Sequence, residues 1–305
     1  MVHDHDHSAD HNHAPQDFGR AFAIGTALNL AFVAIEFTYG VLANSMALIA
    51  DAGHNLGDVF GLLIAWGAAT LARRPPSARF TYGLRSSSIL AALANAALLL
   101  IAVGAIAWEA VHRFSTPAPV AAKTVTLVAA IGIAINLGTA LMFISGRKQD
   151  INIRGAYLHM AADAAVSLGV VLAGIAILMT GWTWIDPLVS LVIAGVIVWS
   201  TWSLLRDSLN MALDAVPAGI DTVAVRAFLE RLEGVDRIHD LHIWPMSTTE
   251  TALTCHLVMS KGHPGDAFLA GVAHDLEHRV KIMHPTLQIE IGDAGNCALE
   301  PDHVV

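Results

Sequence analysis

The sequence has few charged side chains and few cysteines. Only 14% of its 305 residues are charged, and 55% are hydrophobic, whereas a soluble domain carries about 25% charged residues. This balance argues against an ordinary soluble protein and predicts a membrane protein. The two cysteines, Cys255 and Cys297, are too few for a disulfide framework, and we expect both to stay reduced in a cytoplasmic segment.

Positive charge is also scarce, because 17 basic residues face 26 acidic ones and the net charge is −9. Such a balance argues against nucleic acid as a partner. Residues 1–15 lack the basic flank and cleavage pattern of a signal peptide, so we expect them to remain on the mature protein. This tail contains His3, His5, His7, His11 and His13. Two readings stay open, a loose collector of metal ions and a flexible, solvated tail or expression remnant that binds nothing.

Six apolar stretches have roughly the twenty residues or more that a tilted helix needs to cross a bilayer. Their approximate limits are 18–42, 46–71, 86–111, 120–144, 152–180 and 184–205. Basic residues concentrate at one set of ends, and the other set carries only Arg113 and Lys123. The positive-inside rule then places both termini in the cytoplasm. We therefore expect a six-helix transmembrane domain over 16–212, inserted in a lipid bilayer that is the bacterial inner membrane.

From about residue 213 onward, the sequence resembles that of a soluble domain. A helix capped by Asp221, strands over 235–244 and 249–259, a helix over 264–282 and a strand over 286–291 follow in the order α-β-β-α-β. Two helices on one face of a small sheet form an independent α+β unit. We expect this cytoplasmic domain over 213–295 and a C-terminal tail over 296–305.

One short pattern occurs twice, as His54-x-x-x-Asp58 in the second apolar stretch and His159-x-x-x-Asp163 in the fifth. A spacing of four residues places a nitrogen and an oxygen on one helix face, about one turn apart. Ionisable groups at membrane depth are costly and usually mark a path for ions or protons. We name these four residues the His/Asp quartet, and we predict that two helices bring them together into a tetrahedral site for a divalent metal.

The quartet combines two neutral imidazoles with two carboxylates, a set that suits zinc and, less tightly, cadmium or cobalt. The two carboxylates cancel the charge of the ion, whereas the empty site holds two uncompensated negative charges that protons can relieve. Metal and protons then compete, which predicts exchange of a metal ion against protons. The alternative is that each pair is an internal polar contact that bridges helices and binds nothing.

Other polar residues in the apolar stretches have several possible roles. Asp51 shares a helix face with His54 and could be an exit-path carboxylate, a helix cap or a hydrogen-bond partner of a neighbouring span. Glu36 reads as a contact between helices rather than a metal ligand. Arg85 and Asp207 lie at the same predicted face of the membrane, so we expect them to form an ion pair.

Several motifs resemble those of the cation diffusion facilitators, in particular their zinc-transporting branch. They are LIADAGHNLGD at 48–58, YLHMAAD at 157–163, Asp186-Pro187, and HDLHIW at 239–244, and the resemblance covers nearly the whole chain. It implies a homodimeric zinc/proton antiporter that exports zinc from the cytoplasm, with a six-helix membrane domain and a ferredoxin-like cytoplasmic domain.

The resemblance also implies site residues. The transport ligands fall on the His/Asp quartet, and a cytoplasmic zinc site falls on His239, His256 and Glu290. Cys297, beyond the last strand, could reach a metal near Glu290. Zinc is then the transported substrate and a ligand of the cytoplasmic domain, and protons are the counter-ion.

Two other classes compete with a transporter. A membrane metalloenzyme has little support, because the sequence lacks His-Glu-x-x-His and four protein ligands would close the metal site to substrate. A membrane-anchored metal sensor or storage protein stays open from the sequence alone.

Overall fold

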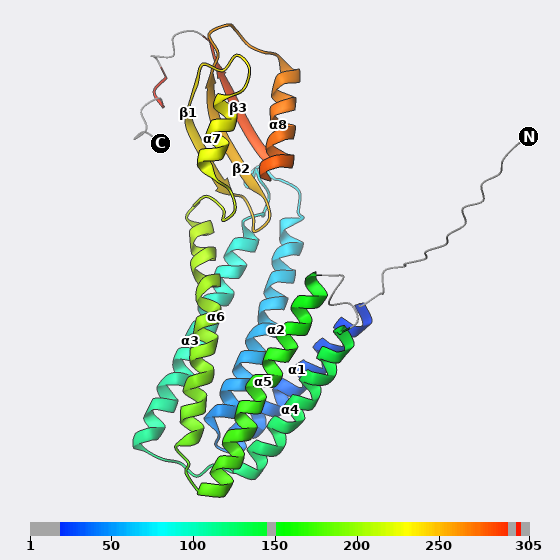
Figure 1. The fold of residues 1–305 in the computed structure, drawn as a ribbon, viewed down its shortest axis with the longest axis vertical. Coiled ribbons are helices and arrows are strands. Elements are labelled where there is room, and N and C mark those ends of the chain that lie inside the picture. Colours follow the sequence, from blue (N-terminus) through cyan, green and yellow to red (C-terminus); the bar gives the residue numbers. More distant parts are fainter. Residues whose placement is uncertain (1–18, 145–150, 292–296, 300–305) are drawn as a thin grey trace, which may run out of the picture. The chain divides into compact units, whose positions relative to one another are not determined.

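Six long helices make up the membrane part of the computed structural model, which describes residues 19–144, 151–291 and 297–299. They are α1 (Gly19–Leu42), α2 (Met46–Ala72), α3 (Ser87–Ser115), α4 (Ala122–Phe143), α5 (Ile151–Thr180) and α6 (Ile185–Ala212) (Figure 1). Over the described residues, five are long and apolar enough to cross a membrane, and α1 contributes the shorter apolar stretch Ala27–Leu42. The predicted helical membrane domain is confirmed. The histidines of the N-terminal tail lie outside the described residues.

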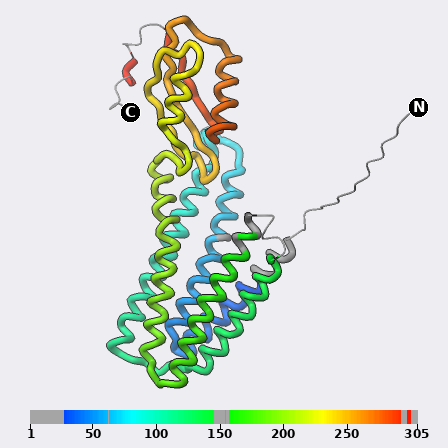
Figure 2. The backbone as a smooth tube through the Cα atoms, viewed as in Figure 1, coloured from blue at the N-terminus to red at the C-terminus, as the bar shows by residue number. Residues whose placement is uncertain are grey.

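The chain divides into two compact units. One contains α1, α2 up to Val59, α3 from Val103, α4, α5 and α6 up to Gly195, and the other contains the remaining parts of α2, α3 and α6 with the C-terminal domain. Within the first unit, α4 packs along α5 over much of its length and also contacts α1, as the traces of these helices in Figure 2 show. All four residues of the His/Asp quartet belong to this unit.

Glycines allow the helices of the first unit to approach closely. A Cβ atom added at Gly174 of α5 would lie 2.3 Å from the hydroxyl oxygen of Thr126 on α4 and 3.3 Å from the Thr126 backbone nitrogen. A Cβ atom added at Gly132 of α4 would lie 2.7 Å from the ring of Phe32 on α1. Membrane helices associate through this kind of close packing, because lipid tails remove the hydrophobic driving force between helices.

We expect Gly174→Val to destabilise the membrane domain by about 1 to 3 kcal/mol, because the larger side chain must push α4 away from α5. Gly169→Val is the matched control on the same helix, since a Cβ atom at Gly169 meets nothing within 4 Å. The melting temperatures of the two variants in detergent check this. Equal losses in both variants would mean that the α4–α5 contact contributes little.

The start of α2 is held by side chains from two other helices. Asn44 takes a left-handed backbone conformation with φ 55°, and Arg113 of α3 donates to its backbone carbonyl at 2.6 Å and to its side-chain oxygen at 2.7 Å. Asp186, in the first turn of α6, accepts hydrogen bonds from the Ser45 hydroxyl and from the Met46 backbone N–H, the latter at 2.6 Å. A carboxylate at this position satisfies donors that a helix N-terminus leaves free.

The C-terminal part forms the small α+β domain that the sequence predicts. Its elements are α7 (Thr222–Glu230), β1 (Arg237–Pro245), β2 (Thr251–Val258), α8 (Asp266–Val280) and β3 (His284–Glu290) (Figure 1). The sheet order is β1-β2-β3, with β1 antiparallel and β3 parallel to β2. The parallel pair requires a crossover connection, and α8 provides it.

Both helices of this domain cover the same face of the sheet. Buried residues of α7 and α8 share one core with alternate residues of β2, among them Val225, Leu229, Leu253, Cys255, Leu257, Val272 and Leu276. Burial raises the pKa of the Cys255 thiol to about 12, so this thiol stays protonated and unreactive at neutral pH. The opposite face of the sheet is left to the other residues of the strands, which include His256.

The predicted ion pair between Arg85 and Asp207 is wrong. The Arg85 guanidinium lies 2.5 Å from the carboxylate of Glu250, in the connection between β1 and β2. Asp207 pairs with its neighbour Arg206 at 3.2 Å. The acidic partner of Arg85 comes from the β1–β2 hairpin of the same unit and not from the end of another membrane helix.

Candidate metal centres

The His/Asp quartet comes together between α2 and α5. His54 Nε2 lies 3.5 Å from Asp163 Oδ1, and His159 Nε2 lies 3.4 Å from Asp58 Oδ2. Within the helices, His159 Nε2 lies 3.6 Å from Asp163 Oδ2, and His54 Nδ1 lies 3.8 Å from Asp58 Oδ2. The spacing of four residues in each motif thus brings His54, Asp58 and Asp163 together, with His159 beside both carboxylates.

These separations suit a tetrahedral zinc ion. With bonds of about 2.0 to 2.2 Å to nitrogen and oxygen, the ligand atoms of such an ion lie roughly 3.3 to 3.6 Å apart. Three of the four separations in the quartet, 3.4, 3.5 and 3.6 Å, fall in this range. Ligand atoms of His54, Asp58 and Asp163 all lie within 4.8 Å of one another. His159 lies beside both carboxylates but outside this group of three, so its side chain would have to move for all four residues to bind one ion.

The charges of the quartet favour a cationic ligand. Asp163 is 3% exposed, and Asp163 Oδ1 and Asp58 Oδ2 are buried oxygens with no hydrogen-bond donor in the part of the chain that the structure describes. Among the described residues, only the two imidazoles form ion pairs with these carboxylates. His159 is the most exposed member at 43%. The quartet is therefore shielded from solvent at Asp163 and accessible to solvent beside His159. Buried oxygens without a donor call for a metal ion or a proton.

Residues next to the quartet include two that the sequence left ambiguous. Asp51 is fully buried and accepts a hydrogen bond of 2.8 Å from the Ser167 hydroxyl on α5. A hydrogen bond to a neighbouring span was one of the three readings of this residue. Glu36 of α1 is also fully buried, and Asn55 of α2 donates to it at 3.3 Å. Both carboxyl groups therefore contact the helices that carry the quartet.

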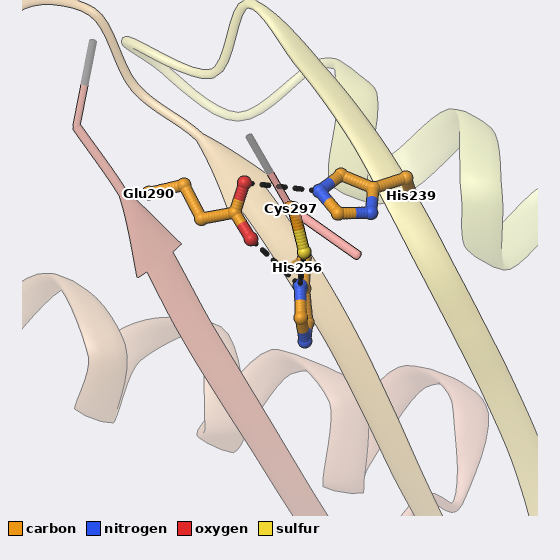
Figure 3. A group of neighbouring side chains, drawn as sticks. All are labelled: His239, His256, Glu290 and Cys297. Carbon is orange, nitrogen blue, oxygen red and sulfur yellow. Dashed lines mark hydrogen bonds and ion pairs between the residues drawn. The ribbon is translucent and has the colours of Figure 1, made fainter. Parts of the chain in front are cut away.

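A second group of metal-binding side chains lies in the C-terminal domain. It consists of His239, His256, Glu290 and Cys297, whose ligand atoms all lie within 4.8 Å of one another, and we name it the cytoplasmic cluster. Figure 3 shows the Glu290 carboxylate between the two imidazoles. One carboxylate oxygen lies 3.1 Å from His239 Nε2 and the other 2.8 Å from His256 Nδ1. The Cys297 sulfur lies 3.7 Å from the same nitrogen of His256.

Strand register builds the cytoplasmic cluster. His239 of β1 and His256 of β2 are directly opposite one another, and Glu290 at the end of β3 is opposite Val258, two residues beyond His256. Residues opposite one another or two positions apart on neighbouring strands share a face and can touch. A register irregularity follows His239, where Asp240 has φ 52°. Such irregularities often redirect side chains next to functional sites.

The pKa values of two cluster residues, Glu290 and Cys297, are shifted from their usual ranges. Partial burial raises the pKa of Glu290, but hydrogen bonds from His239, Cys297 and His256 outweigh it, so its pKa lies below the usual range. A hydrogen bond to the Leu299 backbone lowers the pKa of Cys297, but burial and the neighbouring Glu290 outweigh it, so the net shift is upward. Glu290 is therefore ionised at neutral pH, whereas a metal must displace a proton from Cys297.

Two residues that hold the helices of the quartet give little signal in the sequence. Asp186 entered only as part of a motif, and its hydrogen bonds to the start of α2 join residues 140 positions apart. Ser167 gave no signal beyond being a small polar residue in an apolar helix. Its spacing of four from Asp163 would have placed it on the same helix face, one turn away.

Comparison with known proteins places this chain in one class, the metal transporters of membranes. The chain matches the cation efflux transmembrane domain over residues 22–211 and the cytoplasmic domain of cation efflux proteins over residues 217–291.

Three relatives span most of this chain. A cadmium, cobalt and zinc/H(+)-K(+) antiporter of Bacillus subtilis is 36% identical, covering 92% of this chain and 91% of its own. The zinc transporter ZitB of Escherichia coli is 34% identical, covering 95% and 93%. The metal cation efflux system protein CzcD of Cupriavidus metallidurans is 36% identical, covering 93% and 90%. The chain therefore belongs to the cation efflux family, the cation diffusion facilitators that its motifs resemble, and is a multi-pass membrane transporter rather than an enzyme.

Proposed function

We propose that this protein exports zinc, and with lower preference cadmium or cobalt, from the cytoplasm in exchange for protons. The His/Asp quartet is the transport site. The ion binds when the site is open to the cytoplasm and leaves when the site is open to the other side. Protons then take its place on the imidazoles or carboxylates and return with the empty site.

The observation that carries this proposal is the meeting of two carboxylates and two imidazoles, in which Asp58 Oδ2 and Asp163 Oδ1 receive no hydrogen bond from any described residue. Two negative charges in a low-dielectric interior are unstable without a cation. A doubly charged ion neutralises them, and so do two protons. The names of the relatives, which include zinc transporters and a metal/proton antiporter, support the same reading.

Family membership and the distribution of basic residues also support a location and an assembly. We propose that both termini lie in the cytoplasm, that the membrane is the bacterial inner membrane, and that the protein works as a homodimer. The match to the cytoplasmic domain of cation efflux proteins supports a dimer built through this domain.

Transport is tested in proteoliposomes that contain the purified full-length protein, a pH gradient and a zinc-sensitive dye. The proposal expects zinc flux that depends on the pH gradient, with cadmium run in parallel to rank selectivity. Zinc binding without any flux would instead favour the membrane-anchored sensor or storage protein.

We further propose that the cytoplasmic cluster binds a second zinc ion through His239, His256, Glu290 and Cys297. Two imidazoles, one carboxylate and one thiolate form a set that zinc accepts readily. His239 Nδ1 is buried and has no hydrogen-bond partner among the residues described, and the other nitrogen of this ring faces Glu290. Bound zinc would tie together the three strands that carry the histidines and the glutamate.

We expect Cys297→Ser to weaken zinc binding at the cytoplasmic cluster by about tenfold or more, the range seen when support for a metal site is removed. The pKa of Cys297 is raised, so zinc displaces its proton and wild-type affinity rises with pH. This part of the pH dependence should disappear in the variant. Competition with a chelator measures both effects, in an Asp163→Asn background that disables the quartet. Unchanged affinity and pH dependence would exclude Cys297 as a ligand.

A further inference from the structure

Glu36 of α1 and Asp51 of α2 form a buried pair of carboxyl groups outside the His/Asp quartet. Both side chains are 0% exposed. Asn55 donates to Glu36 Oε2 at 3.3 Å, and Ser167 donates to Asp51 Oδ2 at 2.8 Å. The remaining oxygens, Glu36 Oε1 and Asp51 Oδ1, are buried and receive no hydrogen bond from a donor group of the described residues.

Glu36 contacts Asn55, which lies one turn after Asp51 on the same face of α2, so the two carboxyl groups are neighbours. No lysine, arginine or histidine among the described residues forms an ion pair with either. Two ionised carboxylates in contact repel one another, and in a low-dielectric interior this repulsion is strong. Each has one oxygen that lacks a donor, so a single proton held between them removes one charge and satisfies both oxygens.

We infer that Glu36 and Asp51 share one proton and form a proton-binding site of the exchange reaction, separate from the four proposed metal ligands. This inference rests on the proposed function and extends it, because it adds a proton carrier that never touches the transported ion.

The pair is linked to the quartet through both helices that carry it. Asp51 lies one turn before His54 on α2, and Ser167 lies one turn after Asp163 on α5. The titratable groups whose charges act on the pair from these helices are His54 and Asp163. Groups at this spacing titrate as a set rather than one by one.

Zinc loading then changes the proton count of the pair. When the empty quartet holds fewer than two protons, a bound Zn²⁺ raises the positive charge one helix turn away from Asp51. The shared proton leaves for water, and the second negative charge that remains on the pair is balanced by the charge of the ion. When zinc departs, one proton returns.

Isothermal titration calorimetry tests the inference on the full-length protein in detergent. Titrations with zinc chloride in buffers of different ionisation enthalpy give the number of protons released for each zinc bound. Glu36→Gln keeps the size and hydrogen-bonding capacity of the side chain but cannot titrate. We expect this variant to bind zinc and to release fewer protons than the wild type, with a deficit that approaches about one.

The wild type and Glu36→Gln both contain the cytoplasmic cluster. Zinc therefore displaces the same number of protons there in both, and the difference between the two proteins reports on the pair. Asp207→Asn, which alters an exposed carboxylate of α6, is the matched control and should release as many protons as the wild type. Equal proton release by wild type and Glu36→Gln would overturn the inference. If Glu36→Gln does not fold, Asp51→Asn is expected to give the same deficit.

Infrared spectroscopy of the wild type requires no variant. The metal-free protein at neutral pH should show a protonated-carboxyl band that zinc removes, and the absence of any such band would also overturn the inference. Failure of the proposed function looks different, because zinc flux would then persist in Asp163→Asn. If flux is lost in that variant while Glu36→Gln releases a full complement of protons, transport through the quartet stands and the pair alone is excluded.

Discussion

Asp163→Asn abolishes zinc flux in proteoliposomes, because it removes one of the two charges that balance the ion. The amide keeps the size of the side chain, so the helices still pack. Asp163 is 3% exposed, and a dication at that depth without its second carboxylate carries an uncompensated charge, which costs several kcal/mol. We expect flux to fall by about 100-fold or more, since 1.4 kcal/mol corresponds to a factor of ten.

The control for this experiment is Asp207→Asn, the same chemical change at an exposed position of α6 whose carboxylate pairs only with its neighbour Arg206 among the described residues. It should transport zinc at the wild-type rate. Both variants should elute and melt as the wild type does, so that loss of flux in Asp163→Asn cannot come from loss of fold. Wild-type flux in Asp163→Asn would remove this residue from the transport site.

Asp186→Ala lowers both the stability of the membrane domain and its zinc flux. The substitution leaves the Ser45 hydroxyl and the Met46 N–H, two buried donors at the start of α2, without their acceptor. Each unsatisfied donor costs about 1 to 3 kcal/mol. Because α2 carries His54 and Asp58, a displaced start of this helix also moves two of the four proposed ligands.

The two effects of Asp186→Ala can be separated by a second variant. Asp186→Asn retains one acceptor oxygen of the same geometry, so we expect its stability and flux to lie between those of the wild type and Asp186→Ala. The measurements are the melting temperature in detergent and the initial rate of zinc flux. If Asp186→Ala melts with the wild type yet loses flux, Asp186 contacts the ion path directly and does not act through the position of α2.

Much of the architecture could be predicted from local patterns in the chain. Apolar stretches of membrane length gave limits close to those of α1 to α6, and alternation such as Leu253, Cys255 and Leu257 marked the face of β2 that packs against the helices. The quartet was accessible for the same reason, since a spacing of four residues reports a shared helix face regardless of what the helix packs against. These features depend on neighbours in the sequence.

Features that depend on tertiary contacts could not be predicted from the sequence or were predicted wrongly. Arg85 pairs with Glu250, 165 positions away, and no spacing indicates that the β1–β2 hairpin meets the start of α3. Asp186 supports a helix that begins 140 positions earlier. The Glu36–Asp51 pair required knowledge that α1 and α2 bring two acidic groups together, whereas the sequence indicates only that each is unusual in an apolar helix.

The measurement that tests the central claim most directly is simultaneous recording of zinc and proton flux in proteoliposomes with dyes for both ions. If zinc and protons compete for the His/Asp quartet, zinc entry drives proton exit, a reversed pH gradient reverses zinc flux, and both flows disappear together in a variant with His54→Ala and Asp163→Asn. Zinc movement at the wild-type rate in that double variant, or zinc movement with no opposing proton flow in the wild type, would contradict the account.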